Sequence, residues 1–161
     1  MVFGNSRETS DLIVDALLSW WQTTKQTHSK VKELVINLDN GPSVSSSRTQ
    51  FLKRMVEFAQ STRLTIRLLY FPPYHSKYNP IEHCWGVLER HWNGALLSSI
   101  KTVLCWASSM TWRGKHPSVE CIDKEYHTGI SLNKKEMSPY LGYLIRSKSL
   151  PKWDLTITPE L

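Results

Sequence analysis

The chain has 161 residues, of which 40% are hydrophobic and 21% charged, so it can bury a core and is too apolar to be disordered. It contains no apolar run near the roughly 18 residues of a membrane span and no signal-peptide segment, so we expect a cytoplasmic protein without membrane contact. The net charge of +6 favours a polyanionic partner but does not identify one.

Hydrophobic spacing predicts alternating helices and strands. In chain order we expect a strand end at 1–6, a helix at 7–22 capped by Ser6 or Thr9, a strand at 33–39, a helix after the serine-rich 43–47, a strand at 64–71, helices at 79–92 and 98–112, a strand at 119–123, a short helix at 134–143 and a strand at 153–158. Because helices flank the strand at 33–39, we expect it to be parallel and buried. The order predicts an α/β protein with short parallel strands.

The strand at 33–39 ends in a candidate metal ligand, Asp39, within the run Leu34-Val-Ile-Asn-Leu-Asp39-Asn-Gly-Pro42. With a period of two, Val35, Asn37 and Asp39 share one face of this strand. Open α/β sheets place their ligands at the carboxyl ends of parallel strands, which favours a site at Asp39. Asp-Asn-Gly-Pro is also an ordinary turn sequence, so a purely structural role stays open.

A second candidate ligand, Glu82, follows in the run Tyr74-His-Ser-Lys-Tyr-Asn79-Pro-Ile-Glu82-His-Cys-Trp85-Gly86. Asn79 as N-cap, Pro80 at the first helical position and Glu82 at the third fit a capping box, which needs no catalysis. A helix N-terminus also stabilises a carboxylate anion, so both roles are compatible. Two carboxylates offer the hard oxygen ligands that Mg²⁺ prefers, and phosphodiester cleavage commonly uses two such ions.

The loop before this helix is basic and aromatic. His75, Lys77 and Tyr78 are candidate DNA contacts, because cations beside aromatic rings suit a phosphate backbone and an unpaired base. Tyr70 is assigned to the same loop, and three residues on or near the second helix could extend a basic face: Arg48, Lys53 and Arg54. Two alternatives to DNA contact stay open: the tyrosines pack on the core, and the basic residues form only a solvated side of the helix.

A zinc site near Glu82 is not favoured. The neighbouring candidates are His83, Cys84 and His91. Ligand pairs on one helix need spacings of three or four residues, whereas Cys84 lies seven residues and His83 eight residues before His91.

The two runs around Asp39 and Glu82 closely resemble the DDE domain of bacterial insertion-sequence transposases, with the Rhodopirellula-type transposase family as the nearest match. The resemblance covers most of the chain; it is most specific between Asp39 and Trp92 and fainter at 126–130 and 153–157. It implies the RNase H-like fold of the retroviral-integrase superfamily, DNA partners (transposon ends and target), a possible homo-oligomer, and two Mg²⁺ or Mn²⁺ ions. It makes Asp39 and Glu82 the later acids of the catalytic triad, which carries out strand cleavage and strand transfer.

The first acid of that triad has no counterpart at a strand end upstream of Asp39. We therefore expect a partial RNase H-like fold lacking its first strands, with a catalytic core at 1–97 and an α+β extension of the same domain at 98–161. The strand at 33–39 would then have an exposed edge that invites pairing or aggregation. We expect such a fragment, from an interrupted gene or a misassigned start, to be inactive or nearly so by itself.

Two other functions stay open. A stand-alone RNase H-like nuclease would need a third acid from the tail, such as Asp123 or Glu125. A non-catalytic DNA-binding or oligomerising remnant would bind DNA in a salt-sensitive way without needing Asp39 or Glu82.

Overall fold

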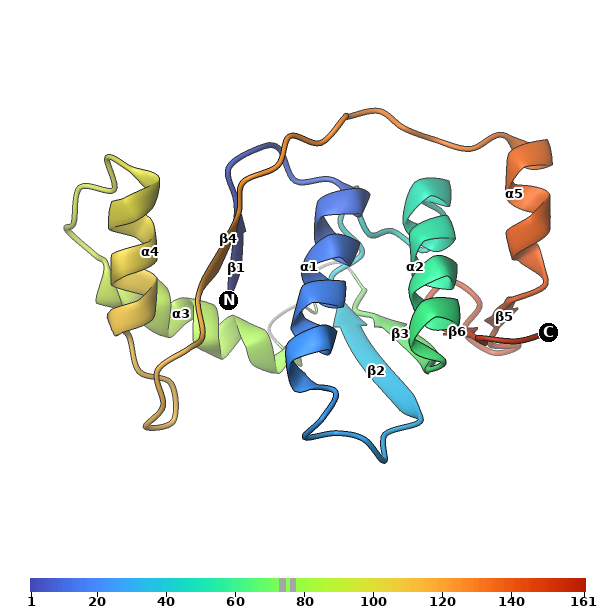
Figure 1. Ribbon diagram of the computed structural model, residues 1–161, viewed down its shortest axis with the longest axis horizontal. Helices are drawn as coiled ribbons and strands as arrows, with labels where there is room; N and C mark the ends of the chain where they lie inside the picture. Colours follow the sequence, from blue (N-terminus) through green and yellow to red (C-terminus); the bar gives the residue numbers. More distant parts are fainter. Residues whose placement is uncertain (73–74, 76–77) are drawn as a thin grey trace. The chain divides into compact units, whose positions relative to one another are not determined.

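The computed structural model describes residues 1–72, 75 and 78–161, which form two compact units with five helices and two sheets (Figure 1). Unit 1 consists of Met1–Arg7 and His75–Glu125, and unit 2 of Glu8–Tyr74 and Tyr126–Leu161. Unit 1 contains β1 (Val2–Gly4), α3 (Pro80–His91), α4 (Ile100–Ser109) and β4 (Glu120–Ile122). Unit 2 contains α1 (Ser10–Thr24), β2 (Glu33–Leu38), α2 (Thr49–Thr62), β3 (Thr65–Tyr70), α5 (Lys134–Leu141), β5 (Leu144–Arg146) and β6 (Asp154–Ile157).

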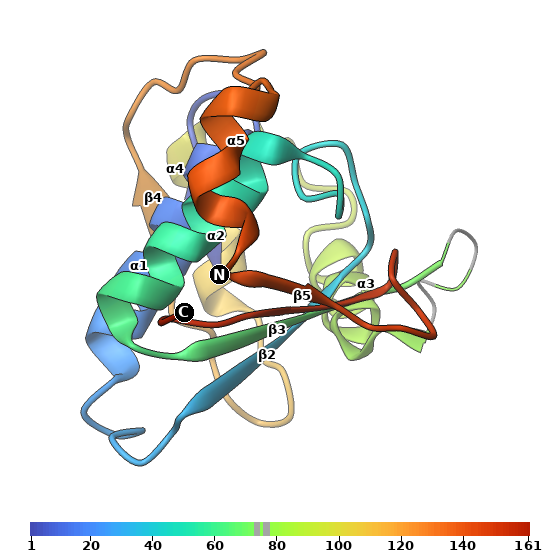
Figure 2. The same ribbon diagram turned by 90° about the vertical axis from the view of Figure 1, so that its right-hand side faces the viewer.

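Unit 2 is a four-stranded sheet of order β2-β3-β6-β5, with α1, α2 and α5 on one of its faces (Figure 2). The predicted parallel pairing is confirmed for β2 with β3, and β1 also pairs with β4 in parallel. The expectation of parallel strands throughout is wrong, because β3 pairs with β6 and β5 with β6 in antiparallel fashion. β5 and β6 are joined by a short connection, and such connections link antiparallel neighbours. β5 has only three residues and was not predicted from the sequence.

The core of unit 2 follows from the alternation along its central strands. Ile66 and Leu68 of β3 are fully buried, and in the antiparallel register they lie opposite Ile157 and Leu155 of β6, which are also fully buried. The apolar face of α2 covers these side chains, with Phe51, Met55, Val56, Phe58 and Ala59 among its buried residues. The opposite face of the sheet carries exposed residues such as Arg67 within this unit.

β2 lies at the edge of this sheet and is only half buried. Leu34, Ile36 and Leu38 pack partly against the core, whereas Val35 is 50% exposed. The expectation of a buried strand is therefore wrong, although the two faces alternate as predicted. The outer edge of β2 pairs with no other strand among the described residues.

Unit 1 packs α3 and α4 on a small apolar core beside the β1–β4 pair. Cys84 and Leu88 of α3 are buried against Ala107 and Met110. His91, one of the zinc candidates, lies 3.0 Å through Nε2 from the Ser109 hydroxyl, and its ring meets Trp106 edge-on. These contacts give His91 a packing role between the two helices.

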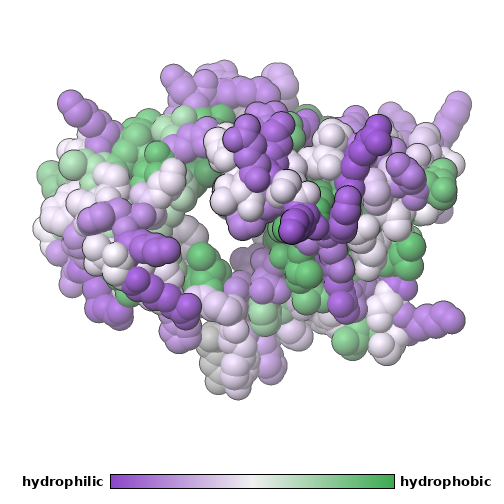
Figure 3. All heavy atoms as spheres, turned by 60° about the horizontal axis from the view of Figure 1, so that its bottom comes forward, coloured by the Kyte–Doolittle hydropathy of each residue, from purple (hydrophilic) through white to green (hydrophobic). Residues whose placement is uncertain are grey.

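The predicted N-terminal cap of α1 is confirmed. Of the two candidate caps for α1, Thr9 is the one used, and its Oγ1 accepts a 3.2 Å hydrogen bond from the Leu12 N–H. In the described part of the chain no helix has the length and apolar character needed to cross a membrane. Hydrophilic residues predominate on the face shown in Figure 3, and hydrophobic residues gather there in separate patches.

Candidate catalytic carboxylates and DNA contacts

Asp39 directly follows β2 and is exposed. Its Oδ1 accepts a 3.0 Å hydrogen bond from the backbone N–H of Gly41. Asn40 has a φ of 62°, a left-handed conformation that asparagine tolerates, and a Cβ at Gly41 would lie 3.2 Å from Asp39 Oδ1. The turn thus fixes the carboxylate at the strand end, so the turn role and a ligand role are compatible.

Glu82 is the third residue of α3 and is exposed. The predicted cap is confirmed, because the Oδ1 of the buried Asn79 accepts a 3.4 Å hydrogen bond from the Ile81 N–H. The full capping box is not formed at this helix, since no bond from the Asn79 N–H to the Glu82 carboxylate is found among the described residues; α5 has such a box, between Asn133 and Glu136. The Glu82 carboxylate therefore accepts no capping hydrogen bond from the backbone of Asn79.

The other four aspartates are each held by a side chain of a neighbour. In unit 1, the Asn5 amide donates to Asp123. In unit 2, Arg67 donates two hydrogen bonds to Asp154, of 3.0 and 2.8 Å, and these bonds hold the pKa of the Asp154 carboxyl below its usual range. Among the residues that the structure describes, Asp39 is the aspartate whose carboxylate is bonded by backbone alone.

Asp11 and Asp15 belong to an ion-pair network that the sequence did not predict, and the expectation that Arg54 adds to a basic face is wrong, because its guanidinium is paired with these two carboxylates. The Arg54 guanidinium donates to Asp11 at 3.2 Å and to Asp15 at 2.5 Å, and the Gln50 amide also donates to Asp11. The Tyr126 hydroxyl donates to Asp15 at 2.9 Å, and burial, followed by this bond, raises the pKa of Tyr126 to about 12. The spacing of Asp11 and Asp15, four residues apart on one helix, was the available signal. Their role is to join α1 to α2.

The predicted aromatic contacts divide between the core and the surface. His75 and Tyr78 stack with ring centroids 6.0 Å apart, and Tyr78 is 65% exposed, so these two rings lie together at the surface of unit 1. Lys77 lies outside the described residues. Tyr70 does not belong to the loop: it is the last residue of β3, and burial raises its pKa well above the ordinary value.

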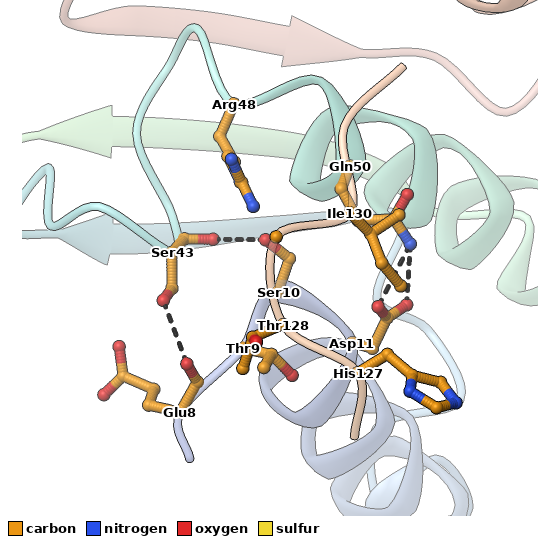
Figure 4. A pocket seen from close by; sticks show the side chains of 11 residues that line it. Glu8, Thr9, Ser10, Asp11, Ser43, Arg48, Gln50, His127, Thr128 and Ile130 are labelled. Carbon is orange, nitrogen blue, oxygen red and sulfur yellow. Dashed lines mark hydrogen bonds between the residues drawn. The ribbon is translucent and has the colours of Figure 1, made fainter.

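Arg48 lines a small polar pocket of about 70 Å³ in unit 2, shown in Figure 4. It is the N-cap residue of α2 and is half buried rather than part of an exposed helix side. Its Nε is buried and has no hydrogen-bond partner within the described part of the chain. Across the pocket, Ser10 donates 2.6 Å to the Ser43 carbonyl, and the Ser43 hydroxyl donates to the carbonyl of Glu8. These bonds join Ser10, Ser43 and Glu8 beside Arg48, and the predicted DNA contact of Arg48 stays a prediction.

Each unit thus presents one exposed candidate carboxylate, Asp39 after β2 in unit 2 and Glu82 in the first turn of α3 in unit 1, and carboxylate oxygens are the ligands that Mg²⁺ prefers. The model of the Rhodopirellula transposase DDE domain matches residues 1–159, nearly the whole chain, and the chain belongs to this family. Membership implies an RNase H-like fold and a function in DNA transposition at the level of the family. No curated protein and no solved structure shows significant similarity to the chain.

Proposed function

We propose that the chain acts in metal-dependent cleavage and transfer of DNA strands, with Asp39 and Glu82 as metal-binding carboxylates. One observation carries the assignment of Asp39: it is the exposed aspartate that no side chain holds among the described residues. Glu82 matches the later acid of the family motif and is likewise exposed, without an ion pair in the described part of the chain. Within this function, residues 1–97 would form the catalytic core and 98–161 its extension.

The carboxylates of Asp39 and Glu82 suit the divalent metal ions that the family implies. Carboxylate oxygens are the ligands of Mg²⁺ and Mn²⁺, and when bound these ions would stabilise charge on the attacking and leaving oxygens of a phosphodiester. The Gly41 N–H orients the Asp39 carboxylate through Oδ1. Asp39 belongs to unit 2 and Glu82 to unit 1, so each carboxylate is described within its own unit. His75 and Tyr78 would contact the DNA backbone or an unpaired base near Glu82, which lies in the same unit.

Metal binding tests the two carboxylates directly. We expect Asp39→Asn and Glu82→Gln each to weaken Mn²⁺ binding by at least about tenfold, measured by electron paramagnetic resonance of the free ion, because each removes a ligand. Two exposed glutamates on the same elements serve as matched controls: Glu33→Gln at the start of β2 and Glu89→Gln on α3. Equal affinities in all four variants and the native chain would contradict the proposal.

We further propose that the chain has little or no activity by itself. Two carboxylates are few for two metal ions, and the remaining aspartates are engaged by Arg54, Arg67 or Asn5. The assay is strand cleavage of end-labelled DNA with Mg²⁺ or Mn²⁺. Turnover that Asp39→Ala abolishes would overturn this part of the proposal.

The role of Asp123 distinguishes the stand-alone nuclease from the proposed function. In the nuclease, Asp123 is a catalytic acid, and Asp123→Asn would abolish a measurable cleavage. In the structure the Asp123 carboxylate accepts a hydrogen bond from Asn5, next to the β1–β4 pair, which favours a structural role. We therefore expect Asp123→Asn to lower the stability of unit 1 and leave Mn²⁺ affinity unchanged.

A further inference from the structure

Unit 1 contains an open apolar groove of about 630 Å³, and no predicted site residue within the described part of the chain lines it. This volume is in the range of small-molecule sites. Its lining residues are Met1, Val2, Ile81, Cys84, Trp85, Trp112, Arg113, Lys115, His116 and Pro117. The groove combines two indole rings with three basic side chains, and it has no acidic residue in its lining.

One wall of the groove is the face of α3 next to Glu82. Ile81, Cys84 and Trp85 line it from this helix, and Trp85 lies three residues after Glu82, so the two side chains are neighbours on the helix surface. Cys84 is buried, whereas Trp85 is 43% exposed. A large aromatic ring left this exposed in an apolar groove offers a flat surface to a ligand.

The other wall includes a tight turn that carries two cationic residues, Arg113 and Lys115. Trp112 and Lys115 exchange backbone hydrogen bonds of 2.8 and 3.0 Å. The two residues between them, Arg113 and Gly114, both have positive φ, of 50° and 76°, as a two-residue hairpin turn of type I′ requires. The turn places the Arg113 guanidinium 5.5 Å from the centroid of the Trp112 ring, a cation–π contact.

His116, the third basic residue, is also oriented. Its Nδ1 lies 2.8 Å from the carbonyl oxygen of Met110, and because a carbonyl only accepts, this nitrogen donates the bond. The Arg113 guanidinium and the His116 ring are therefore each oriented by a contact within the unit, and the turn fixes the backbone that carries Lys115.

We propose that this groove binds an unpaired nucleotide of a DNA strand, with the base stacked on Trp85 and the phosphate beside Arg113 and Lys115. The inference rests on the proposed function, since it places the nucleotide one helical turn from Glu82. Aromatic faces that stack on bases, next to cations that follow the backbone, are what single-stranded nucleic acid requires. Among the described lining residues the charged and basic side chains are Arg113, Lys115 and His116, with no acidic side chain, and this balance favours a phosphate over an apolar peptide, which would leave the cations without a partner.

The test compares two DNA duplexes of equal phosphate number, one blunt and one with a short unpaired 3′ tail, by fluorescence anisotropy in EDTA. The native chain is expected to bind the tailed duplex more tightly. Trp85→Ala should lower affinity for the tailed duplex by about 5- to 150-fold, the range for losing one stacked base, and leave the blunt duplex within about twofold. Trp85→Phe keeps an aromatic face and should retain most of the affinity.

Trp20→Ala is the matched control, because Trp20 is 40% exposed and lies on α1 of unit 2, outside the groove. It should bind both duplexes like the native chain. A Trp85→Ala affinity equal to that of the native chain, or an equal loss on both duplexes, overturns the proposal. A change in sedimentation velocity without a change in DNA affinity would show a protein interface and also overturns it.

Cross-linking keeps the test independent of any folding defect in the variant. With 5-iodouracil in the unpaired tail, the native chain should cross-link at Trp85 or Trp112, and cross-links confined to other residues refute the subsite. Because metal is absent, these results do not depend on Asp39 or Glu82 as ligands. If the native chain binds neither duplex, the proposed DNA function fails as well; if it binds both equally, only the nucleotide subsite fails.

Discussion

Removal of the Arg54 guanidinium should destabilise unit 2 strongly, because this side chain neutralises two carboxylates of another helix. Arg54 donates to Asp11 and Asp15 at 3.2 and 2.5 Å, and its Nε lies 3.5 Å from Glu57. The side chains of Arg54, Asp11 and Asp15 are only 25%, 15% and 23% exposed. Truncation would leave Asp11 and Asp15 partly buried without their cation.

The magnitude lies between two known limits. Breaking a fully buried pair by removing one partner costs about 3–5 kcal/mol, and an exposed pair contributes about 0–1 kcal/mol. Since about three quarters of each side chain is buried, we expect Arg54→Ala to lower the free energy of unfolding by about 2–4 kcal/mol. Arg54→Lys should lower the free energy of unfolding by a smaller amount than Arg54→Ala, because lysine keeps the charge but loses the geometry that reaches both carboxylates.

Lys53 is the matched control on the same helix. It forms one pair with Glu57, four residues along α2, at 3.7 Å, and both side chains are at least 32% exposed. Lys53→Ala should therefore cost less than about 0.5 kcal/mol. Urea unfolding followed by far-ultraviolet circular dichroism measures both variants. Equal midpoints for Arg54→Ala and Lys53→Ala would refute the reasoning.

Two further predictions concern the sheet of unit 2. Leu68→Ala on the fully buried face of β3 should cost about 2–5 kcal/mol in urea unfolding, whereas Leu69→Ala on the opposite, partly exposed face should cost clearly less; a reversed order would contradict the observed strand register. The bonds from Arg67 lower the pKa of Asp154, so their stabilisation is present above the unfolded pKa of about 3.9 and is lost as the pH falls through the lower native value. The difference in unfolding free energy between the native chain and Asp154→Asn should therefore be full at neutral pH and shrink below about pH 4. A difference that stays constant with pH would show that the Asp154 carboxylate contributes only through packing.

Elements whose signals are local were predictable from the sequence. The cap at Thr9, the cap at Asn79 and the strand end before Asp39 each depend on a few neighbouring residues, and the structure has all three. The family motif around Glu82 is equally local, so the family could be identified from the sequence alone.

Contacts between distant segments needed the tertiary structure. The C-terminal β6 pairs with β3, which makes Tyr70 a core residue rather than a loop residue. The partners of Arg54 on α1 lie about forty positions away, and Tyr126 joins them from 111 positions away. No local pattern could assign these partners, because they are selected by how α1 and α2 pack.

The sequence by itself determined the family, the alternation of helices and strands, and the positions of Asp39 and Glu82 at the ends of their elements, because backbone propensity, capping and motif spacing act over a few residues. Only the tertiary structure decided which strands pair, which carboxylates are neutralised, and that Trp85 and Trp112 line one groove. These outcomes depend on burying apolar surface between segments far apart in the chain, and that requirement is met by the fold as a whole rather than by any one segment.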